Sequence, residues 1–128
     1  MKIDPILAVK NVPKSSTWYQ TIFDWSSIHG GDEFDVLTNA QDEVMLCLHK
    51  WGEHNHPTMM DSNIENGNGL ILHFRVENIT SIREKLRTLT HPVETEMALS
   101  PNSGKKEFSL KDPDGYFMII AEYHNYKG

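Results

Sequence analysis

The chain has 128 residues, 38% of them hydrophobic, and its 12 basic and 18 acidic residues give a net charge of -6 with neutral histidines. This length and composition predict one compact globular domain. The acidic balance argues against a nucleic-acid partner, which needs a basic face, and no apolar run reaches the roughly 18 residues of a membrane span. The single cysteine, Cys47, cannot form an internal disulfide, and residues 1–10 lack a signal peptide's apolar core. We therefore expect a cytoplasmic protein.

The first half of the chain predicts a strand, a helix and three further strands. Residues 6–9 are a short apolar run after a proline. Pro13 suits the first turn of a helix, and apolar residues at helical spacing continue it to about Phe23. Residues 26–29, 34–38 and 43–49 are expected strands, separated by turns rich in glycine, asparagine and aspartate.

The second half repeats this order. Residues 70–76 predict a strand, and Asn78 is a plausible cap for a helix over residues 79–88. Three strands are expected at residues 94–97, 107–110 and 116–123, the last one after the turn Asp-Pro-Asp-Gly. A polar loop over residues 53–68 separates a first module, residues 1–52, from a second, residues 69–128. The predicted fold class is α+β, with tandem βαβββ modules.

Two stretches carry a family resemblance. "FSLKDPDGYFMIIAE" (108–122) and "ILAVKNVPKSSTWYQTIFDW" (6–25) resemble the vicinal oxygen chelate superfamily, which includes glyoxalase I, extradiol dioxygenases and bleomycin resistance proteins. Asp24-Trp25 stands where Leu-Gly-Phe is commoner in that family. The resemblance covers nearly the whole chain. It implies two modules whose mixed sheets curl around a central cavity, and a homodimer.

The resemblance also implies four metal-ligand positions, one on the first and one on the last strand of each module. They fall on Asp4, Leu46, Ile71 and Ile119. Leu46 is placed by counting back from Trp51. Three of the four residues are aliphatic and have no lone pair for a cation. We therefore expect no metal and no other cofactor at these positions.

Several polar or aromatic residues are further candidates. His73 and Arg75 follow Ile71 at two-residue steps, so all three are expected on one strand face, where His73 could bind a polar group or act as acid or base. Trp51 could stack on a flat ligand or plug the space between modules. His54 and His56 form a His-x-His pair with His49 and Glu53 nearby. Such a pair can bind zinc or nickel, but without a third ordered ligand it is more typical of a polar loop.

The leading hypothesis is a small-molecule binding protein similar to the metal-free bleomycin resistance branch. It would sequester an amphipathic or aromatic molecule, such as an antibiotic. The expected apolar walls are Ile6, Ala8, Leu46, Leu48, Ile71 and Ile119, with Trp51, His73 and Arg75 as the aromatic and polar contacts. Cys47 should face away from Leu46 and Leu48 as an inert thiol.

Two alternatives stay open. One is a lyase, isomerase or transferase of the same superfamily that uses His73 or relocated metal ligands. The other is a dimeric interaction domain whose cavity is filled.

Overall fold

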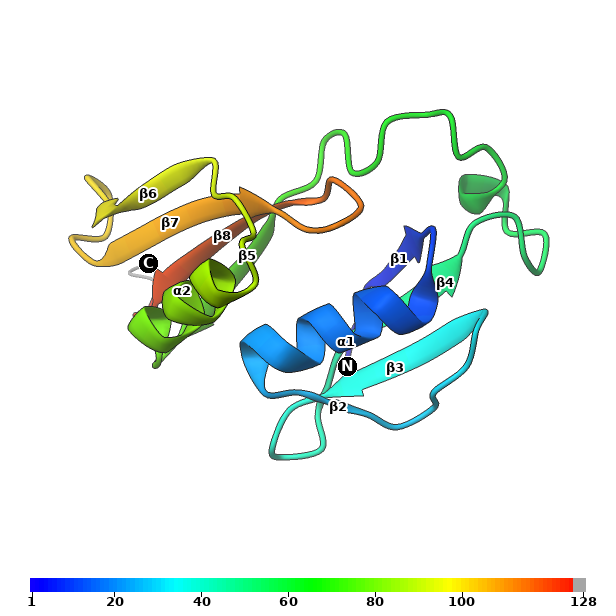
Figure 1. Ribbon diagram of the computed structural model, residues 1–128, viewed down its shortest axis with the longest axis horizontal. Helices are drawn as coiled ribbons and strands as arrows, with labels where there is room; N and C mark the ends of the chain where they lie inside the picture. The colour runs from blue at the N-terminus through cyan, green and yellow to red at the C-terminus, as the bar shows by residue number, and fades with distance from the viewer. Residues whose placement is uncertain (126–128) are drawn as a thin grey trace. The chain divides into compact units, whose positions relative to one another are not determined.

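The computed structural model describes residues 1–125, which divide into two compact units. Unit 1 covers Met1–Asn66 and unit 2 begins at Gly67, so the division falls within the predicted linker. Each unit has one α-helix and one four-stranded mixed sheet (Figure 1). Each sheet is open, and the first and last strands in its strand order lie at its edges. The α+β class and the repeated βαβββ order are confirmed.

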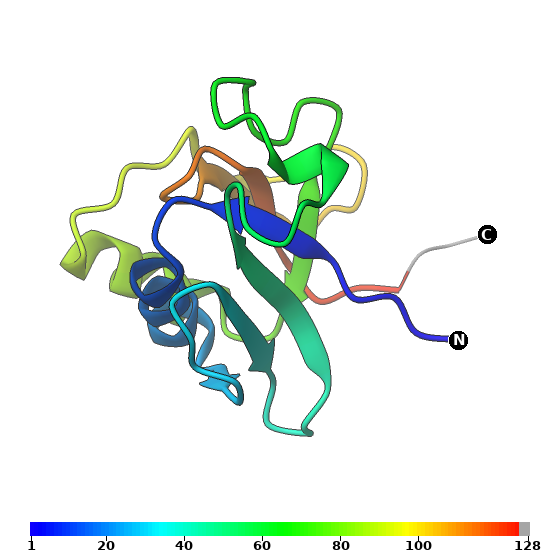
Figure 2. The same cartoon turned by 90° about the vertical axis from the view of Figure 1, so that its right-hand side faces the viewer.

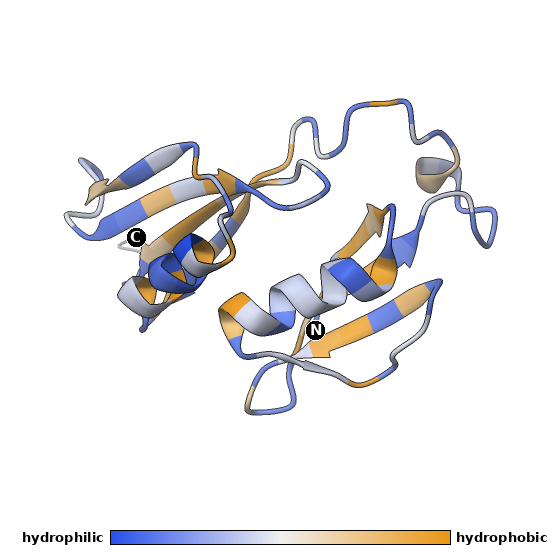
Figure 3. Ribbon diagram, viewed as in Figure 1, coloured by the Kyte–Doolittle hydropathy of each residue, from blue (hydrophilic) through white to orange (hydrophobic). Residues whose placement is uncertain are grey.

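Unit 1 follows the predicted order of elements. In chain order they are β1 (Ile6–Val9), α1 (Val12–Phe23), β2 (Ser26–Ser27), β3 (Phe34–Thr38) and β4 (Val44–Lys50). The strand order is β1-β4-β3-β2, in which β1 and β4 are parallel and the other neighbours are antiparallel. A 3-10 helix, η1 (Pro57–Met59), follows β4 and buries Met59. Figure 3 shows that the segment around η1 and up to unit 2 is mostly hydrophilic.

The start of α1 is set by local side-chain chemistry. Asn11 has an extended backbone, and its Oδ1 accepts a hydrogen bond from the Lys14 amide at 2.9 Å. Pro13 lies in the first turn, as predicted, where a missing amide proton costs nothing. Asp24 ends the helix in the left-handed region, with φ 58°. Figure 2 shows α1 to one side of the strands of unit 1.

Unit 2 repeats the architecture. Its elements are β5 (Leu72–Val76), α2 (Ile79–Thr88), β6 (Thr95–Leu99), β7 (Lys106–Lys111) and β8 (Phe117–Glu122). The strand order is β5-β8-β7-β6, with β5 and β8 parallel. Asn78 occupies the N-cap position of α2, as predicted, but its side chain makes no capping hydrogen bond. Among residues 1–125, no helix is both long and apolar enough to cross a membrane.

Most strand boundaries differ from the sequence prediction by one or two residues, as at the strands predicted over residues 70–76 and 26–29. The strand predicted over residues 70–76 begins only at Leu72, because the Leu70 amide donates to the Gly67 carbonyl at 2.9 Å and is held in a turn. The strand predicted over residues 26–29 is reduced to Ser26–Ser27. The Asp-Pro-Asp-Gly turn forms as predicted. Asp112 Oδ1 accepts from the Tyr116 amide at 2.9 Å, and Gly115 has φ 92°.

One face of the unit 1 sheet packs against α1. Asp35 on β3 marks this face, because its carboxylate accepts a hydrogen bond from Ser16 Oγ of α1 at 2.6 Å. Residues paired across neighbouring strands point to the same face of a sheet. Leu48 pairs with Asp35, so Leu48 and Leu46 both face the helix, and at most 1% of each residue is exposed.

The opposite face of this sheet, here termed the open face of unit 1, carries a different set of residues. Ile6 pairs with Cys47, and Ala8 pairs with His49. The expected wall that joined Leu46 and Leu48 to Ile6 and Ala8 is therefore wrong. Counting back from Trp51, which lies beyond β4, displaced the assignment by one residue, and one residue switches the face.

The open face of unit 2 carries the predicted His73, Arg75 and Ile119, whereas Ile71 precedes β5. His73 pairs with Ile119 and Arg75 pairs with Ala121, so all four lie on one face. The face toward α2 is the buried one. It carries a run of apolar side chains that are each at most 8% exposed, namely Leu72, Phe108, Leu110, Met118 and Ile120.

Candidate functional site

The open face of unit 2 combines apolar and polar side chains. Ile119 is half-buried, and His73, paired with it across the strands, is exposed. Arg75 is half-buried and held in place. Its Nη1 donates to the His124 carbonyl at 2.7 Å, and its guanidinium carbon lies 5.1 Å from the centre of the Tyr123 ring. The predicted grouping of Ile119, His73 and Arg75 is present, and Arg75 is already engaged by its own chain.

A buried hydroxyl pair on this face was missed from the sequence. Ser109 pairs with Ile119 across β7 and β8 and is 5% exposed. Its hydroxyl lies 2.6 Å from the hydroxyl of Thr95. Each hydroxyl can donate and accept, so the pair satisfies itself without charge. Only the pairing register could have placed these two residues together.

The open face of unit 1 is mostly buried. Ile6 is 47% exposed, whereas Ala8, Cys47 and His49 are each at most 5% exposed. Burial raises the pKa of the Cys47 thiol, and the negative charges of Asp4 and Asp35 raise it further. The prediction that Cys47 faces away from its leucine neighbours into packing is confirmed, and its chemical inertness stays a prediction.

Trp51 lies just beyond β4, where its amide donates to the Val9 carbonyl at 3.3 Å. The indole Nε1 is buried and has no hydrogen-bond partner among residues 1–125. A buried donor of this kind favours a partner supplied by a bound molecule, because an unpaired buried N–H is costly. The residue therefore offers an aromatic face together with one directed polar group.

Three histidines gather at the end of β4. The ring of His49 lies 5.3 Å from the ring of His54 and 5.0 Å from the ring of His56, measured between centroids. His54 Nε2 is also 3.3 Å from Glu33 Oε2. The sequence suggested Glu53 as the nearby acid, but the acid that contacts the pair comes from the loop before β3.

The four metal-ligand positions implied by the resemblance do not supply a fitting donor set. Leu46 faces α1 in the core. Ile71 is 57% exposed and precedes β5, and Asp4 is exposed and precedes β1. Ile119 is on the open face of unit 2 but has no lone pair. Aliphatic groups cannot coordinate a divalent cation, so these positions do not fit one.

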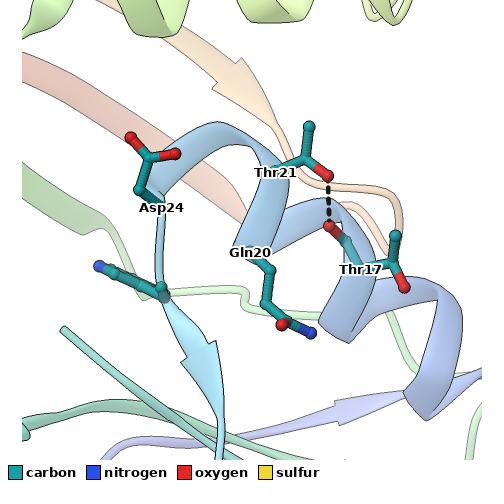
Figure 4. Close-up of a pocket in the computed structure, with 5 residues that line it drawn as sticks. Thr17, Gln20, Thr21 and Asp24 are labelled. Carbon is teal, nitrogen blue, oxygen red and sulfur yellow. Dashed lines mark hydrogen bonds between the residues drawn. The ribbon is translucent and has the colours of Figure 1, made fainter. Parts of the chain in front are cut away.

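Two surface hollows in unit 1 lie apart from the predicted wall residues. One, of about 480 Å³, is lined by polar residues of α1 and by the residues that follow it (Figure 4). Its labelled lining includes Thr17 and Thr21, joined by the 2.7 Å bond from Thr21 Oγ1 to the Thr17 carbonyl, with Gln20 and Asp24 beside them. The other, of about 590 Å³, is lined by residues that include Glu33, Phe34 and His54. Neither has the apolar walls expected for capture of an amphipathic molecule.

The family model of the glyoxalase/bleomycin resistance protein/dioxygenase superfamily matches residues 2–119. The chain belongs to this superfamily. The match includes all four positions at which the resemblance implies metal ligands. A search of curated protein sequences gave no significant match.

Solved structures of the superfamily fold are similar over nearly the whole chain. A lactoylglutathione lyase from Agrobacterium tumefaciens is 16% identical, with a TM-score of 0.69, and the similarity covers 95% of this chain and 92% of that one. A glyoxylase/bleomycin resistance protein/dioxygenase domain from Frankia sp. EAN1pec is 19% identical, with a TM-score of 0.69 and coverage of 97% and 98%. TioX from Micromonospora sp. ML1 is 10% identical, with a TM-score of 0.73 and coverage of 96% and 100%. At these identities the likeness establishes the fold.

Proposed function

We propose that this superfamily member binds and sequesters a small amphipathic or aromatic molecule, such as an antibiotic, without metal at the superfamily's ligand positions. The observation that supports this most is the register of β5 and β8, which sets the aliphatic Ile119 beside His73 on the open face of unit 2. Mostly apolar walls with a few polar anchors are the general form of a small-molecule site.

Each unit, taken by itself, offers polar groups of a different kind. On unit 2, His73 is exposed and can donate or accept one hydrogen bond, and Arg75 is fixed near the Tyr123 ring. On unit 1, the indole of Trp51 supplies a buried N–H and a flat apolar surface. The net charge of -6 favours a cationic or neutral ligand over an anionic one.

The alternative function is a lyase, isomerase or transferase in which His73 acts as general acid or base. The exposed position of His73 on an open sheet face favours this alternative. In such an enzyme Arg75 would stabilise an enolate-like negative charge. Its existing bond to the His124 carbonyl argues against this role, because the guanidinium is already engaged. Turnover lost in His73→Gln with binding retained would identify the enzyme.

A thermal-shift screen of glycopeptide antibiotics, aromatic natural products and small acids tests the binding proposal, since a ligand that binds only the folded state raises Tm. A planar ligand against Trp51 should also quench its fluorescence, with Trp51→Phe assigning the signal. Ile119→Glu should weaken binding at least about tenfold, because it adds a charge that is costly to desolvate. Leu99→Glu adds the same charge at an exposed position of the same sheet and is the control.

A dimer is also proposed, on the strength of the family resemblance, and sedimentation equilibrium would detect it. If a confirmed ligand binds Ile119→Glu as tightly as the original protein, the open face of unit 2 is not the binding site, and the same result for Trp51→Ala would exclude Trp51 as a contact.

A further inference from the structure

The tautomer of His49 is set by its backbone contact. Its Nδ1 lies 2.8 Å from the Lys50 carbonyl oxygen, which can only accept a hydrogen bond, so Nδ1 carries the proton. In the neutral ring the lone pair then resides on Nε2. His49 is 3% exposed, and Nε2 is buried with no hydrogen-bond partner among residues 1–125. The structure therefore contains an ordered, buried imidazole lone pair that nothing in the described chain satisfies.

A second histidine makes a related contact from an exposed side chain. Nε2 of His54 lies 3.3 Å from Glu33 Oε2, and because a carboxylate can only accept, a proton on Nε2 suits this ion-pair contact and leaves the lone pair on Nδ1. In metal sites a histidine ligand almost always donates its other ring N–H to a carboxylate or a backbone carbonyl, which fixes the tautomer. His49 with the Lys50 carbonyl and His54 with Glu33 are one example of each.

The spacing from His49 to each of the other two rings is close to that of a metal centre. Two imidazoles on one tetrahedral zinc have ring centroids roughly 5 Å apart, because each nitrogen lies about 2 Å from the metal. The distances from His49 to His54 and His56 are 5.3 and 5.0 Å, and that between His54 and His56 is 6.4 Å. No three such side chains in residues 1–125 already converge on one metal position. To bind one metal ion together with His49, the rings of His54 and His56 must come closer than their present 6.4 Å. Both residues belong to an exposed loop.

We propose that His49, His54 and His56 bind one divalent transition metal ion of the zinc class. The ligand atoms are His49 Nε2, His54 Nδ1 and one ring nitrogen of His56, and Glu33 is a positioning residue for His54. Neutral imidazoles suit zinc, copper and nickel. The centre differs from the superfamily's ligand positions at Asp4, Leu46, Ile71 and Ile119.

Untagged full-length protein, stripped of metal and titrated with zinc in a calorimeter, tests the proposal. We expect one zinc per chain. His54→Gln and His56→Gln should each lower the affinity by more than about 100-fold, because loss of an outer partner alone typically costs 10–100-fold. Glu33→Gln should fall within that smaller range. These variants change exposed side chains and leave the buried His49 in place. The matched control is His91→Gln in unit 2, which should bind zinc unchanged.

Cobalt(II) binding provides a second readout, which does not depend on any enzymatic activity. Its visible spectrum should show tetrahedral nitrogen and oxygen ligands without a thiolate band, which separates this centre from adventitious binding at Cys47. The proposal is overturned if the original protein binds no zinc, if either His54→Gln or His56→Gln binds it undiminished, or if cobalt reports a thiolate ligand.

Discussion

Arg83 on α2 binds Glu96 on β6 through two parallel hydrogen bonds, from Nε to Oε1 at 2.7 Å and from Nη2 to Oε2 at 2.9 Å. The Arg83 side chain is 10% exposed, whereas that of Glu96 is 57% exposed. The pair joins the helix of unit 2 to the strand at the edge of its sheet. This fork-to-fork geometry fixes the orientation of the two side chains and also pairs their opposite charges.

The first prediction concerns acid stability. The hydrogen bonds from Arg83 lower the pKa of Glu96 from 4.5 to about 2. A carboxyl group with a lowered pKa in the folded state stabilises the fold above its ordinary pKa, and this contribution disappears as the pH falls toward 2. The urea midpoint should therefore fall between pH 4.5 and pH 2, and fall less in Glu96→Gln. Glu94→Gln, an exposed neighbour, should behave like the original protein. Equal acid sensitivity in Glu96→Gln would contradict the assignment.

The second prediction concerns Asp35. Burial alone would raise the pKa of this carboxyl, but hydrogen bonds from Ser16, the Gly30 amide, Ser27 and the Val36 amide outweigh it and lower the pKa. Asp35→Asn removes the charge and forces at least one of these donors to lose its acceptor. The free energy of unfolding should drop by about 2–3 kcal/mol at neutral pH. Chemical denaturation checks this, with Asp32→Asn, an exposed aspartate in the loop before β3, as the control. A drop no larger than that of the control would show that the network contributes little.

The third prediction tests the two faces of the unit 1 sheet. Leu46 is 1% exposed and faces α1, whereas Ile6 is 47% exposed on the open face. Leu46→Ala should cost about 2–5 kcal/mol of unfolding free energy, because it leaves a cavity in the core. Ile6→Ala should cost less than about 1 kcal/mol. If Leu46→Ala proves as mild as Ile6→Ala, the face assignment is incorrect.

The fourth prediction concerns the turn that precedes β5. Gly67 has φ 71°, and a Cβ added there would lie 2.8 Å from Tyr116 Cδ1. Gly69 has φ 86° but would meet nothing within 4 Å. Gly69→Ala should cost about 1–2 kcal/mol from backbone strain alone. Gly67→Ala should cost more, since Tyr116 is 6% exposed and has little room to move. Thermal unfolding of the two variants, measured side by side, isolates the cost of the clash with Tyr116. Equal losses of stability would mean that the Tyr116 ring moves aside freely.

The architecture was predictable because its signals are local. The apolar runs of β1 and β8 and the helical stripes of α1 and α2 depend on neighbours within a few residues. Local signals fail where a contact with a distant part of the chain decides the conformation of a residue. Asn11 and Asn78 both precede a helix, but only Asn11 makes the capping bond.

The candidate site shows the same limit more strongly. The face of Leu46 depends on a pairing register that was counted from a residue outside the strand. His54 and Glu33 lie in separate loops, so no spacing rule could connect them. His49 was predicted in a strand and named only as a neighbour of the His-x-His pair, and the sequence did not show that it is buried in β4 with its tautomer set by the next carbonyl. Distances between segments, rather than residue types, were the missing information.

The parallel pairing of β1 with β4, and of β5 with β8, has a consequence for the order of folding. The strand that opens each unit has its hydrogen-bonded neighbour in the last strand of that unit. During synthesis β1 is made first, yet it gains its partner only after Lys50 has left the ribosome, and β5 waits likewise for Glu122. Unit 1 can complete its sheet before unit 2 has been synthesised. Within each unit, however, the sheet cannot grow in the order in which its strands are made, because the first strand pairs only with the last. A nascent chain stopped within β4 would contain α1, β2 and β3, but β1 would still lack its full hydrogen-bonded neighbour.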